Sequence, residues 1–438
     1  MKFILILLLS ILAMLAGIPL SLNAQRGFNL TLTPTNQSSV AISWLAQSAT
    51  PAGDVVIMPQ FQVERSQDLK HWAAISPALP ASPGEELSVT DSTPDLGFYR
   101  VASIIQMEYA QLSNARLDNG ELQGADFFGA DLFGASLLQA SLSNANLAGA
   151  DLQSANLRQA DLRNADLFNA NAVLATLNAA SLAGANASFS DFEAASLFNA
   201  DLTGADFSFA ILSGANLDFA TFKGMKLDAN TLLDPNHRLV WQVVNNGPTS
   251  VVLTNQDLSF ARFPGVNFTG LRLTGSDLSA DILRDTDFRG ADFSLCNLRF
   301  VDFRGSLMDS NTIIDSKSRL VWQIANQGFG AGRDLHGTNL SSVFLVGANL
   351  ISANLSNSVC TTAIFEHSNF GNAKLNRANC NNCDFFAAIL TNANLSQALF
   401  RSADFTSANL RNAITNGADF TGATFGNTTM PDGSIRKF

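Results

Sequence analysis

Large apolar residues recur along this chain with a period of five. From residue 112 to residue 232, Leu or Phe occupies 23 of 25 positions spaced five apart, the exceptions being Ala172 and Ala187. Ala usually stands two residues earlier, as in the run GADFFGADLFGASLLQASLSNANLAGADLQ that begins at Gly124. Helices repeat about every 3.6 residues and strands about every two, so neither explains this spacing. The pattern predicts a solenoid that turns a corner once per repeat.

The same period appears twice more in a shifted phase. In residues 253–313, Leu or Phe fills 11 of 13 central positions, and Met308 and Ile313 fill the others. In residues 335–425 it fills 16 of 19, with Cys360, Cys380 and Thr415 as exceptions. We therefore expect three repeat tracts, at residues 110–232, 253–313 and 335–430, followed by a C-terminal tail at 431–438.

The consensus A(D/N)LxG of these tracts resembles the pentapeptide-repeat family. The resemblance implies an all-β fold, a right-handed quadrilateral parallel β-helix in which four repeats form one square coil of about 20 residues. The central Leu or Phe and the Ala two residues before it then point inward, and the other three residues point to solvent. Coils stack about 4.8 Å apart through parallel backbone hydrogen bonds. A large inward residue needs a small inward companion, which accounts for the alternation with Ala.

Two segments that interrupt the repeats, residues 233–252 and 314–334, are related to each other. LDANTLLDPNHRLVWQVVNNG, residues 227–247, aligns without a gap to MDSNTIIDSKSRLVWQIANQG, residues 308–328. Asp234 and Asp315 are suited to cap a helix, and Gly247 and Gly328 to end one. The sequence predicts short helices over residues 235–246 and 316–327.

Each predicted helix has one apolar face. Its residues are Leu239, Val240, Val243 and Val244 in the first helix, and Leu320, Val321, Ile324 and Ala325 in the second, with Trp241 and Trp322 beside them. Such a face suits two roles. It either covers the open apolar end of a repeat tract or binds a partner protein.

The N-terminus has the features of an export signal over residues 1–24. Lys2 precedes an uncharged apolar stretch that runs to Leu22, and small Ala24 stands just before Gln25. Leu22 is larger than the residue usual at the third position before a cleavage site. The segment is therefore either cleaved, which sends the protein to the periplasm or the extracellular space, or retained as a membrane anchor.

Residues 28–105 lack the repeat and alternate as strands do. SSVAISWLAQ places Val40, Ile42 and Trp44 on one face, and QFQVERS and LGFYRVASI alternate in the same way. With the turn sequences TPAGD and ASPGEE between them, these strands resemble a small fibronectin type III-like β-sandwich. Sandwiches of this kind commonly act as spacers or adhesion modules, which is an analogy of fold alone.

Acidic charge is concentrated in the first tract. The chain has a net charge of −11 and a pI near 4.8, which argues against binding nucleic acid through its phosphates. Residues 110–232 hold 13 acidic and 5 basic side chains, whereas residues 335–430 hold 4 of each. A period of about 20 residues predicts one column that alternates acid with amide along the stack; its members are Asp126, Asn146, Asp166, Asn186 and Asp206.

Two functions are compatible with this organisation. The first is an exported, non-catalytic structural or interaction scaffold with a protein partner. The alternative comes from the family resemblance, because some pentapeptide-repeat proteins mimic duplex DNA and modulate type II topoisomerases. Export and the near-neutral third tract argue against the mimic.

Residues that carry chemistry are scattered, so we predict no catalytic, metal or cofactor site. His71, His237, His336 and His367 have no spacing that would join them in one site. The four cysteines, Cys296, Cys360, Cys380 and Cys383, occupy inward positions. Export allows a disulfide between the stacked Cys360 and Cys380, but parallel side chains in register rarely reach disulfide geometry, so buried free thiols are the favoured interpretation.

Overall fold

The computed structural model describes residues 107–437 with their side chains, together with the backbone of short strands between residues 20 and 104. His71 and most of the predicted signal segment lie outside the described residues. The chain forms two compact units. One contains the first tract to Leu217 and the segment Gly224–Leu233, and the other contains Asp218–Lys223 and the chain from Asp234 onward.

The N-terminal strands form antiparallel sheets. One has the order β1-β2-β3-β9, and in another β6 pairs with β10, β7 and β8. Leu20–Asn23, at the end of the predicted signal segment, forms β1 and pairs with β2, so a chain cleaved before Gln25 would lack β1. The strands are β1 (Leu20–Asn23), β2 (Asn29–Asn36), β3 (Ser39–Leu45), β4 (Pro51–Ala52), β5 (Val55–Val56), β6 (Gln60–Ser66), β7 (Ala73–Ala74), β8 (Leu79–Pro80), β9 (Glu86–Asp91) and β10 (Phe98–Ile104).

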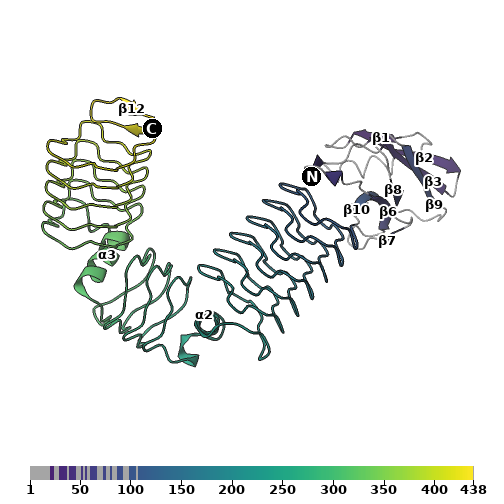
Figure 1. The fold of residues 1–438 in the computed structure, drawn as a ribbon, viewed down its shortest axis with the longest axis horizontal. Coiled ribbons are helices and arrows are strands. Elements are labelled where there is room, and N and C mark those ends of the chain that lie inside the picture. The colour runs from purple at the N-terminus through teal and green to yellow at the C-terminus, as the bar shows by residue number, and fades with distance from the viewer. Residues whose placement is uncertain are drawn as a thin grey trace. The chain divides into compact units, whose positions relative to one another are not determined.

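The repeat tracts are stacks of coils held by single parallel bridges (Figure 1). Each bridge joins the residue before one centre to the equivalent residue four repeats further on, as Asp126 joins Asn146. Leu112 N–H donates to the Asp131 carbonyl at 2.7 Å, and Asp131 N–H donates to the Ala110 carbonyl at 2.9 Å. The coil of four repeats inferred from the family resemblance is therefore confirmed.

The predicted inward positions form the core. The central Leu and Phe residues and the Ala residues two positions before them are almost all buried. In the third tract Phe365, Phe385, Phe405 and Phe425 stack as one ladder, with ring centroids 5.4, 5.0 and 5.5 Å apart. Phe385 and Phe405 each lie between two other rings, and the ladder gives this tract an apolar spine.

The expected register is wrong by one residue at the ends of the first two tracts. Leu232 and Ile313 were predicted to be central, but they are 53% and 54% exposed. Each follows a turn that is one residue longer than in a regular repeat. Leu232 therefore pairs with Ile211, and Ile313 pairs with Asp292. The regular spacing of 20 residues would instead pair Thr231 and Thr312 with these partners. Asp228 stabilises the first turn by accepting from the N–H groups of Asn230 and Thr231.

Helix α2 spans Pro235–Asn246 in the first interruption. Asp234 caps it by accepting from the N–H groups of Asn236 and His237, and Gly247 ends it. Val240 and Val243 are buried, whereas Trp241 is only partly buried. The Asn245 amide also donates to the carbonyl of Trp241, one turn earlier in the same helix, at 3.0 Å. A 3₁₀ turn, η1 (Pro248–Ser250), follows.

Helix α3 spans Ser316–Gln327 and lies between the second and third tracts. Asp315 caps it, and Gly328 ends it in the left-handed conformation. Buried Trp322 donates its indole N–H to the Ser306 carbonyl at 2.9 Å, on the last coils of the second tract. Lys317 Nζ contacts the Ser341 carbonyl of the third tract at 2.5 Å. The helix therefore covers the end of the second tract and is also bonded to the third.

The predicted C-terminal tail forms part of a hairpin at the end of the third tract. Strand β11 (Thr428–Thr429) pairs with β12 (Ile435–Arg436). The Arg436 guanidinium lies 4.7 Å from the ring centroid of Phe425, the last ring of the ladder. Of the helices that the structure describes, none is both long and apolar enough to cross a membrane.

Candidate interaction surface

Five aromatic side chains project to solvent from one corner of the first tract. Each occupies the first or second turn position after a centre, and these centres are residues 107, 127, 167, 187 and 207. The centres belong to successive coils, except that the coil of residue 147, between those of 127 and 167, has no aromatic residue at this corner. Their exposed fractions lie between 40% and 63%. We call this set the aromatic edge; its members are Tyr109, Phe128, Phe168, Phe189 and Phe209.

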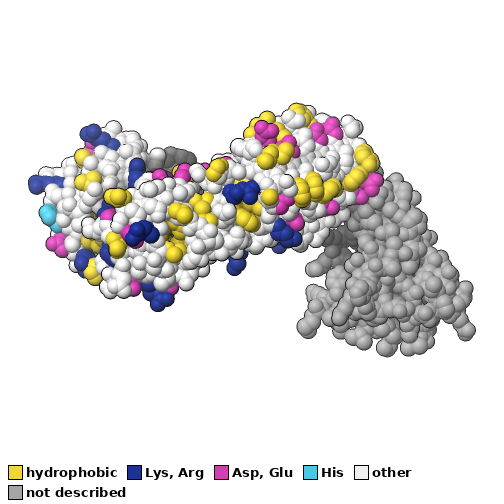
Figure 2. Space-filling view, turned by 90° about the horizontal axis from the view of Figure 1, so that it is seen from below, with side chains coloured by type: hydrophobic (Ala, Val, Ile, Leu, Met, Phe, Trp, Pro, Cys, Tyr) yellow, Lys and Arg dark blue, Asp and Glu magenta, His cyan; other side chains and the backbone are white. Residues whose placement is uncertain are grey.

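The rings of the aromatic edge contact one another. Phe189 and Phe209 are parallel, with centroids 4.6 Å apart, and Phe168 lies 5.5 Å from Phe189. Tyr109 packs edge-on to Phe128 at 5.5 Å. Gly129 makes room for Tyr109, because a Cβ on Gly129 would lie 2.7 Å from the tyrosine ring. On the face shown in Figure 2, exposed hydrophobic side chains form rows with acidic and some basic side chains among them.

Three members of the edge hold an unfavourable backbone conformation. Tyr109 has φ of 52°, and Phe189 and Phe209 both have φ of 60°, in the left-handed region that Gly and Asn adopt at lowest cost. In the same column the chain has Gly129, Gly149 and Asn169. The same turn position is left-handed in most repeats, so what distinguishes this corner is the presence of large, half-exposed rings.

Columns of carboxylates flank the aromatic edge on both sides. On one side Asp126, Asp166 and Asp206 alternate with amides, and Asn146 donates to Asp126 Oδ1 at 2.8 Å. On the other side lie Asp131, Asp151 and Asp191. Each of these six residues accepts, through Oδ1, the backbone N–H two residues later, which fixes its orientation at the corner.

Basic side chains are scarce beside the aromatic edge, where Lys226 pairs with Asp206 at 3.4 Å at the end of one acidic column. The two faces that carry the carboxylate columns have no Lys or Arg between residues 107 and 214, whereas Arg116, Arg158 and Arg163 occupy the other two. Negative charge also extends to the start of the stack. There the pKa of Glu108 is raised, chiefly by a hydrogen bond with the Asp126 carboxyl and also by the negative charge of that carboxyl. The aromatic edge is thus enclosed by acidic surface.

The aromatic edge was not predicted from the sequence, although a signal was present. Phe189 and Phe209 are one coil apart in the sequence, and Phe128 and Phe168 are two coils apart. These side chains occupy turn positions, where the consensus has small or polar residues. A search for large residues outside the core positions, made at the coil period, would have found them.

One carboxyl group is fully buried in the second tract. Asp281 occupies a small inward position, and its Oδ1 accepts from the Ala261 N–H at 2.8 Å. Among the described residues its Oδ2 has no hydrogen-bond partner. Burial raises the pKa of Asp281 well above its ordinary value, and the charges of Asp277 and Asp257 raise it further. Burial therefore favours the protonated, neutral form of this carboxyl group.

Other small inward residues show what Asp281 replaces. Thr286 donates its hydroxyl to the Phe263 carbonyl of the preceding coil at 2.9 Å, and Ser368 bonds in the same way to Leu345 at 2.6 Å. Ser368 Oγ also accepts an N–H from the preceding coil, as Asp281 Oδ1 does.

The described cysteines are free thiols. Cys360, Cys380 and Cys383 are buried, and Cys383 Sγ donates to the Cys360 carbonyl at 2.7 Å. Hydrogen bonds with the thiols of Cys360 and Cys383, together with burial, raise the pKa of Cys380 well above its ordinary value. Cys296 was expected in the core but is only partly buried. Burial raises its pKa to about 11, so Cys296 is a poor nucleophile.

The three described histidines have separate local roles. His237 Nδ1 lies 2.5 Å from the capping Asp234, His336 Nδ1 lies 2.9 Å from the Ser356 hydroxyl, and the His367 ring packs edge-on to Phe386. Within residues 107–437, no group of three or more His, Cys, Asp or Glu side chains is placed to hold a metal ion.

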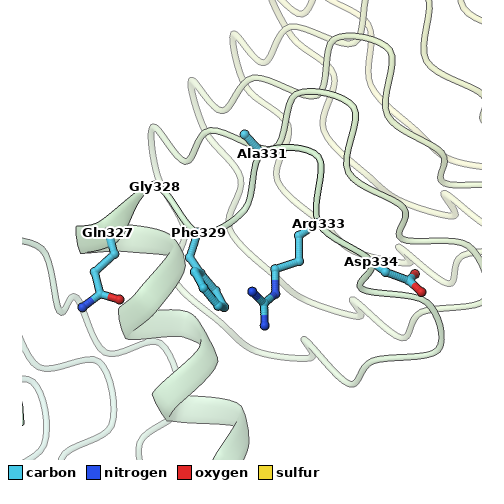
Figure 3. A pocket seen from close by; sticks show the side chains of 6 residues that line it. All are labelled: Gln327, Gly328, Phe329, Ala331, Arg333 and Asp334. Carbon is cyan, nitrogen blue, oxygen red and sulfur yellow. The ribbon is translucent and has the colours of Figure 1, made fainter.

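An open hollow of about 590 Å³ lies where α3 ends and the third tract begins (Figure 3). The Arg333 guanidinium lies 3.3 Å from the Phe329 ring centroid, and Asp334 accepts from Asn354 at 2.8 Å. These contacts hold the side chains that line the hollow against one another or against the next coil, and the hollow is wide open to solvent. Its geometry therefore favours a structural role for these residues.

Comparison with known families agrees with this architecture. The model of pentapeptide repeats matches eight copies, which together cover more than half of the chain. The chain belongs to the pentapeptide-repeat family. The matched residues are 110–147, 125–164, 190–227, 249–280, 282–309, 334–359, 363–401 and 403–431.

Solved structures of the same family are similar to parts of the chain. HetL from the cyanobacterium Nostoc sp. strain PCC 7120, a protein involved in the regulation of heterocyst differentiation, is 22% identical, over 72% of this chain and 94% of HetL, with a TM-score of 0.22. Rfr23 from the cyanobacterium Cyanothece 51142 is 38% identical, over 22% of this chain and 64% of Rfr23, with a TM-score of 0.21.

A third solved structure is QnrB1, a plasmid-mediated fluoroquinolone resistance protein. It is 18% identical, over 45% of this chain and 95% of QnrB1, with a TM-score of 0.15. A comparison with curated proteins gave no match. The TM-scores are low, so the family assignment rests on the repeat model.

Proposed function

We propose that this pentapeptide-repeat protein is an exported, non-catalytic scaffold that binds protein partners through the outward side chains of its coils. The observation that carries the proposal is the columnar surface of the first tract. Backbone bridges repeat there once per coil and set outward side chains in straight columns. A surface of this kind gives a partner many equivalent contacts along its length.

The distribution of chemistry supports a binding role. Inward side chains are almost entirely apolar and close-packed, so the inside of a coil offers no space for a substrate. Acidic and aromatic side chains are instead gathered on one side of the first tract. Pentapeptide-repeat proteins are generally structural or interaction proteins, which agrees with this proposal.

Affinity co-purification tests the scaffold. The full chain carrying a C-terminal tag is expressed in its natural host, cross-linked and recovered, beside a tagged exported protein of similar pI. We expect specific protein partners that are absent from the control. Recovery of the chain alone under cross-linking would contradict the scaffold role.

We also propose that residues 1–24 direct export and that residues 28–105 form a fibronectin type III-like sandwich acting as a spacer. The apolar run to Leu22 supports the first proposal, and the antiparallel pairing of β2, β3 and β9 supports the second. Cell fractionation with N-terminal sequencing tests export. We expect a chain beginning near Gln25 outside the cytoplasm, and a soluble cytoplasmic product that retains Met1 would contradict it.

The second candidate function is a DNA mimic that modulates a type II topoisomerase, and the acidic columns favour it. A mimic depends on concentrated negative charge. Neutralising Asp126, Asp166 and Asp206 together to Asn would therefore remove its activity. We expect no effect of the chain lacking residues 1–24 on DNA supercoiling at micromolar concentration. Inhibition that the triple variant abolishes would replace the scaffold with the mimic.

A further inference from the structure

We infer that the aromatic edge and its flanking carboxylates form a docking site for a polypeptide segment with one apolar and one basic face. This inference rests on the proposed interaction role and names the surface and the chemistry of the partner. The site runs along the stack from the coil of Tyr109 to the coil of Phe209. Its apolar strip lies in the middle, with carboxylates on both sides.

Charge determines which partner fits this edge. Apart from Lys226, which pairs with Asp206 at the end of the site, its two faces carry no Lys or Arg between residues 107 and 226, so the surface repels acidic proteins, nucleic acids and anionic membranes. A second copy of this edge would bring like charges together and is disfavoured for the same reason. Lys or Arg side chains can instead reach the outward carboxylate oxygens. Asp166 accepts both of its hydrogen bonds through Oδ1. Among the described residues, none donates to Asp166 Oδ2, so this oxygen is available to a basic side chain of a partner.

Spacing favours a helical partner. Successive coils are about 4.8 Å apart, close to the roughly 5.4 Å pitch of an α-helix. Apolar side chains that recur once per helical turn therefore stay near the rings at Phe168, Phe189 and Phe209 over several coils. Basic side chains on either side of the helix then face the two acidic columns.

Ring orientation argues against a glycan as the occupant. Sugars stack on the open faces of aromatic rings, but the facing sides of Phe189 and Phe209 are covered by each other, with an interplanar angle of 3°. The rest of each ring is about half exposed and offers apolar contact. Such contact suits the aliphatic side chains of a polypeptide.

A designed peptide provides the probe. It contains about 18 residues of Leu and Lys, with Leu at helical positions i, i+3, i+4 and i+7, and carries a fluorophore for anisotropy measurements with the full chain. Controls are the same peptide with Glu in place of Lys, phosphatidylglycerol vesicles and cellohexaose. We expect saturable binding of the Lys peptide alone, weakening with added salt.

Variants test whether the edge is the site. The triple substitution Phe168→Asn, Phe189→Asn and Phe209→Asn removes the rings, and Asn at the last two positions suits their left-handed backbone. We expect the affinity for the Lys peptide to fall on the order of tenfold or more, with the melting temperature nearly unchanged. The combination of lost binding and retained stability separates docking from folding.

Two deletions supply matched controls. Removing residues 176–180, one repeat, keeps the core pattern but turns Phe189 and Phe209 by one face relative to Phe168, so we expect weak binding. Removing residues 141–160, one whole coil without an edge aromatic, keeps all rings in one line, so we expect binding within about threefold of the original chain.

The outcomes are distinct. Equal peptide affinity in the chain and the triple Phe→Asn variant, or binding of vesicles or cellohexaose in place of the peptide, would overturn the docking site. Partners that co-purify equally with the chain and with the triple variant would support the scaffold role and would show that the aromatic edge does not bind them. Edge-dependent peptide binding without any co-purified protein would support the site and count against the scaffold.

Discussion

At the scale of single residues, Asp281 is the clearest departure from the repeat. From the sequence its position is inward, but nothing in a pattern of residue types shows that a carboxyl group there stays protonated. The structure supplies the reason, because burial raises the pKa of the Asp281 carboxyl by more than the hydrogen bond from the Ala261 N–H lowers it. A buried acid with a raised pKa makes stability depend on pH.

We predict that Asp281→Thr stabilises the second tract increasingly as pH rises above about 4. In the unfolded chain the carboxyl ionises near its ordinary pKa of about 3.9, whereas in the folded chain it stays neutral, so ionisation favours unfolding by roughly 1.4 kcal/mol per pH unit up to the folded pKa. Thr supplies the hydroxyl that Thr286 uses on the next face. Urea unfolding of both chains at pH 4 and pH 7 measures the effect.

Asp277→Asn is the matched control for that experiment. Burial opposes ionisation of Asp277, but hydrogen bonds from Ser279 and Asn297 outweigh it and lower its pKa. Its contribution to stability is therefore present above its unfolded pKa and lost on acidification, the opposite sign to Asp281. A stability difference between wild type and Asp281→Thr that stays constant from pH 4 to pH 7 would show that Asp281 is ionised in the folded chain.

At the scale of elements, the aromatic ladder should dominate the stability of the third tract. Phe385 is fully buried between Phe365 and Phe405, so Phe385→Ala should cost about 3–5 kcal/mol through the cavity it leaves. Asp404→Asn, at an outward position of the same tract, should cost far less. Denaturant unfolding compares the two, and equal shifts in their midpoints would refute the inward and outward assignment.

The two interrupting helices should differ in how strongly they hold the adjacent coils. Trp322 is buried and bonded to the Ser306 carbonyl, whereas Trp241 is only partly buried. We predict that Trp322→Ala lowers hydrogen-exchange protection in residues 298–307 and that Trp241→Ala has a smaller effect on its own neighbours. Unchanged protection beside Trp322→Ala would mean that α3 does not cover the tract end.

These helices also show where sequence interpretation ended. The capping Asp and terminal Gly residues fixed their limits, because capping is local chemistry. The register shift before each helix was missed, since Leu232 and Leu233, like Ile313 and Ile314, are equally apolar neighbours. Only the longer turn, which Asp228 and Asp309 stabilise through backbone N–H groups, decides which of each pair faces inward.

At the scale of the whole molecule, the period of five was enough to predict the fold but not the surface. Inward positions are set by packing, so Leu, Phe and Ala there follow a rule that the sequence displays directly. Outward side chains are free to vary, and which of them share an edge depends on how many repeats complete a coil. The aromatic edge therefore becomes visible only when residues such as Phe189 and Phe209 are placed on successive coils.

The tracts are stacks of coils, each built from four repeats, and we expect whole coils to be interchangeable. Excising residues 141–160 from the full chain tests this expectation, with hydrogen exchange measured in residues 121–140 and 161–180. Excising residues 143–160, which breaks the phase, is the control. We predict that the whole-coil deletion keeps the protection of the original chain and that the out-of-phase deletion loses it. Equal loss of protection in both variants would contradict the stacked-coil account.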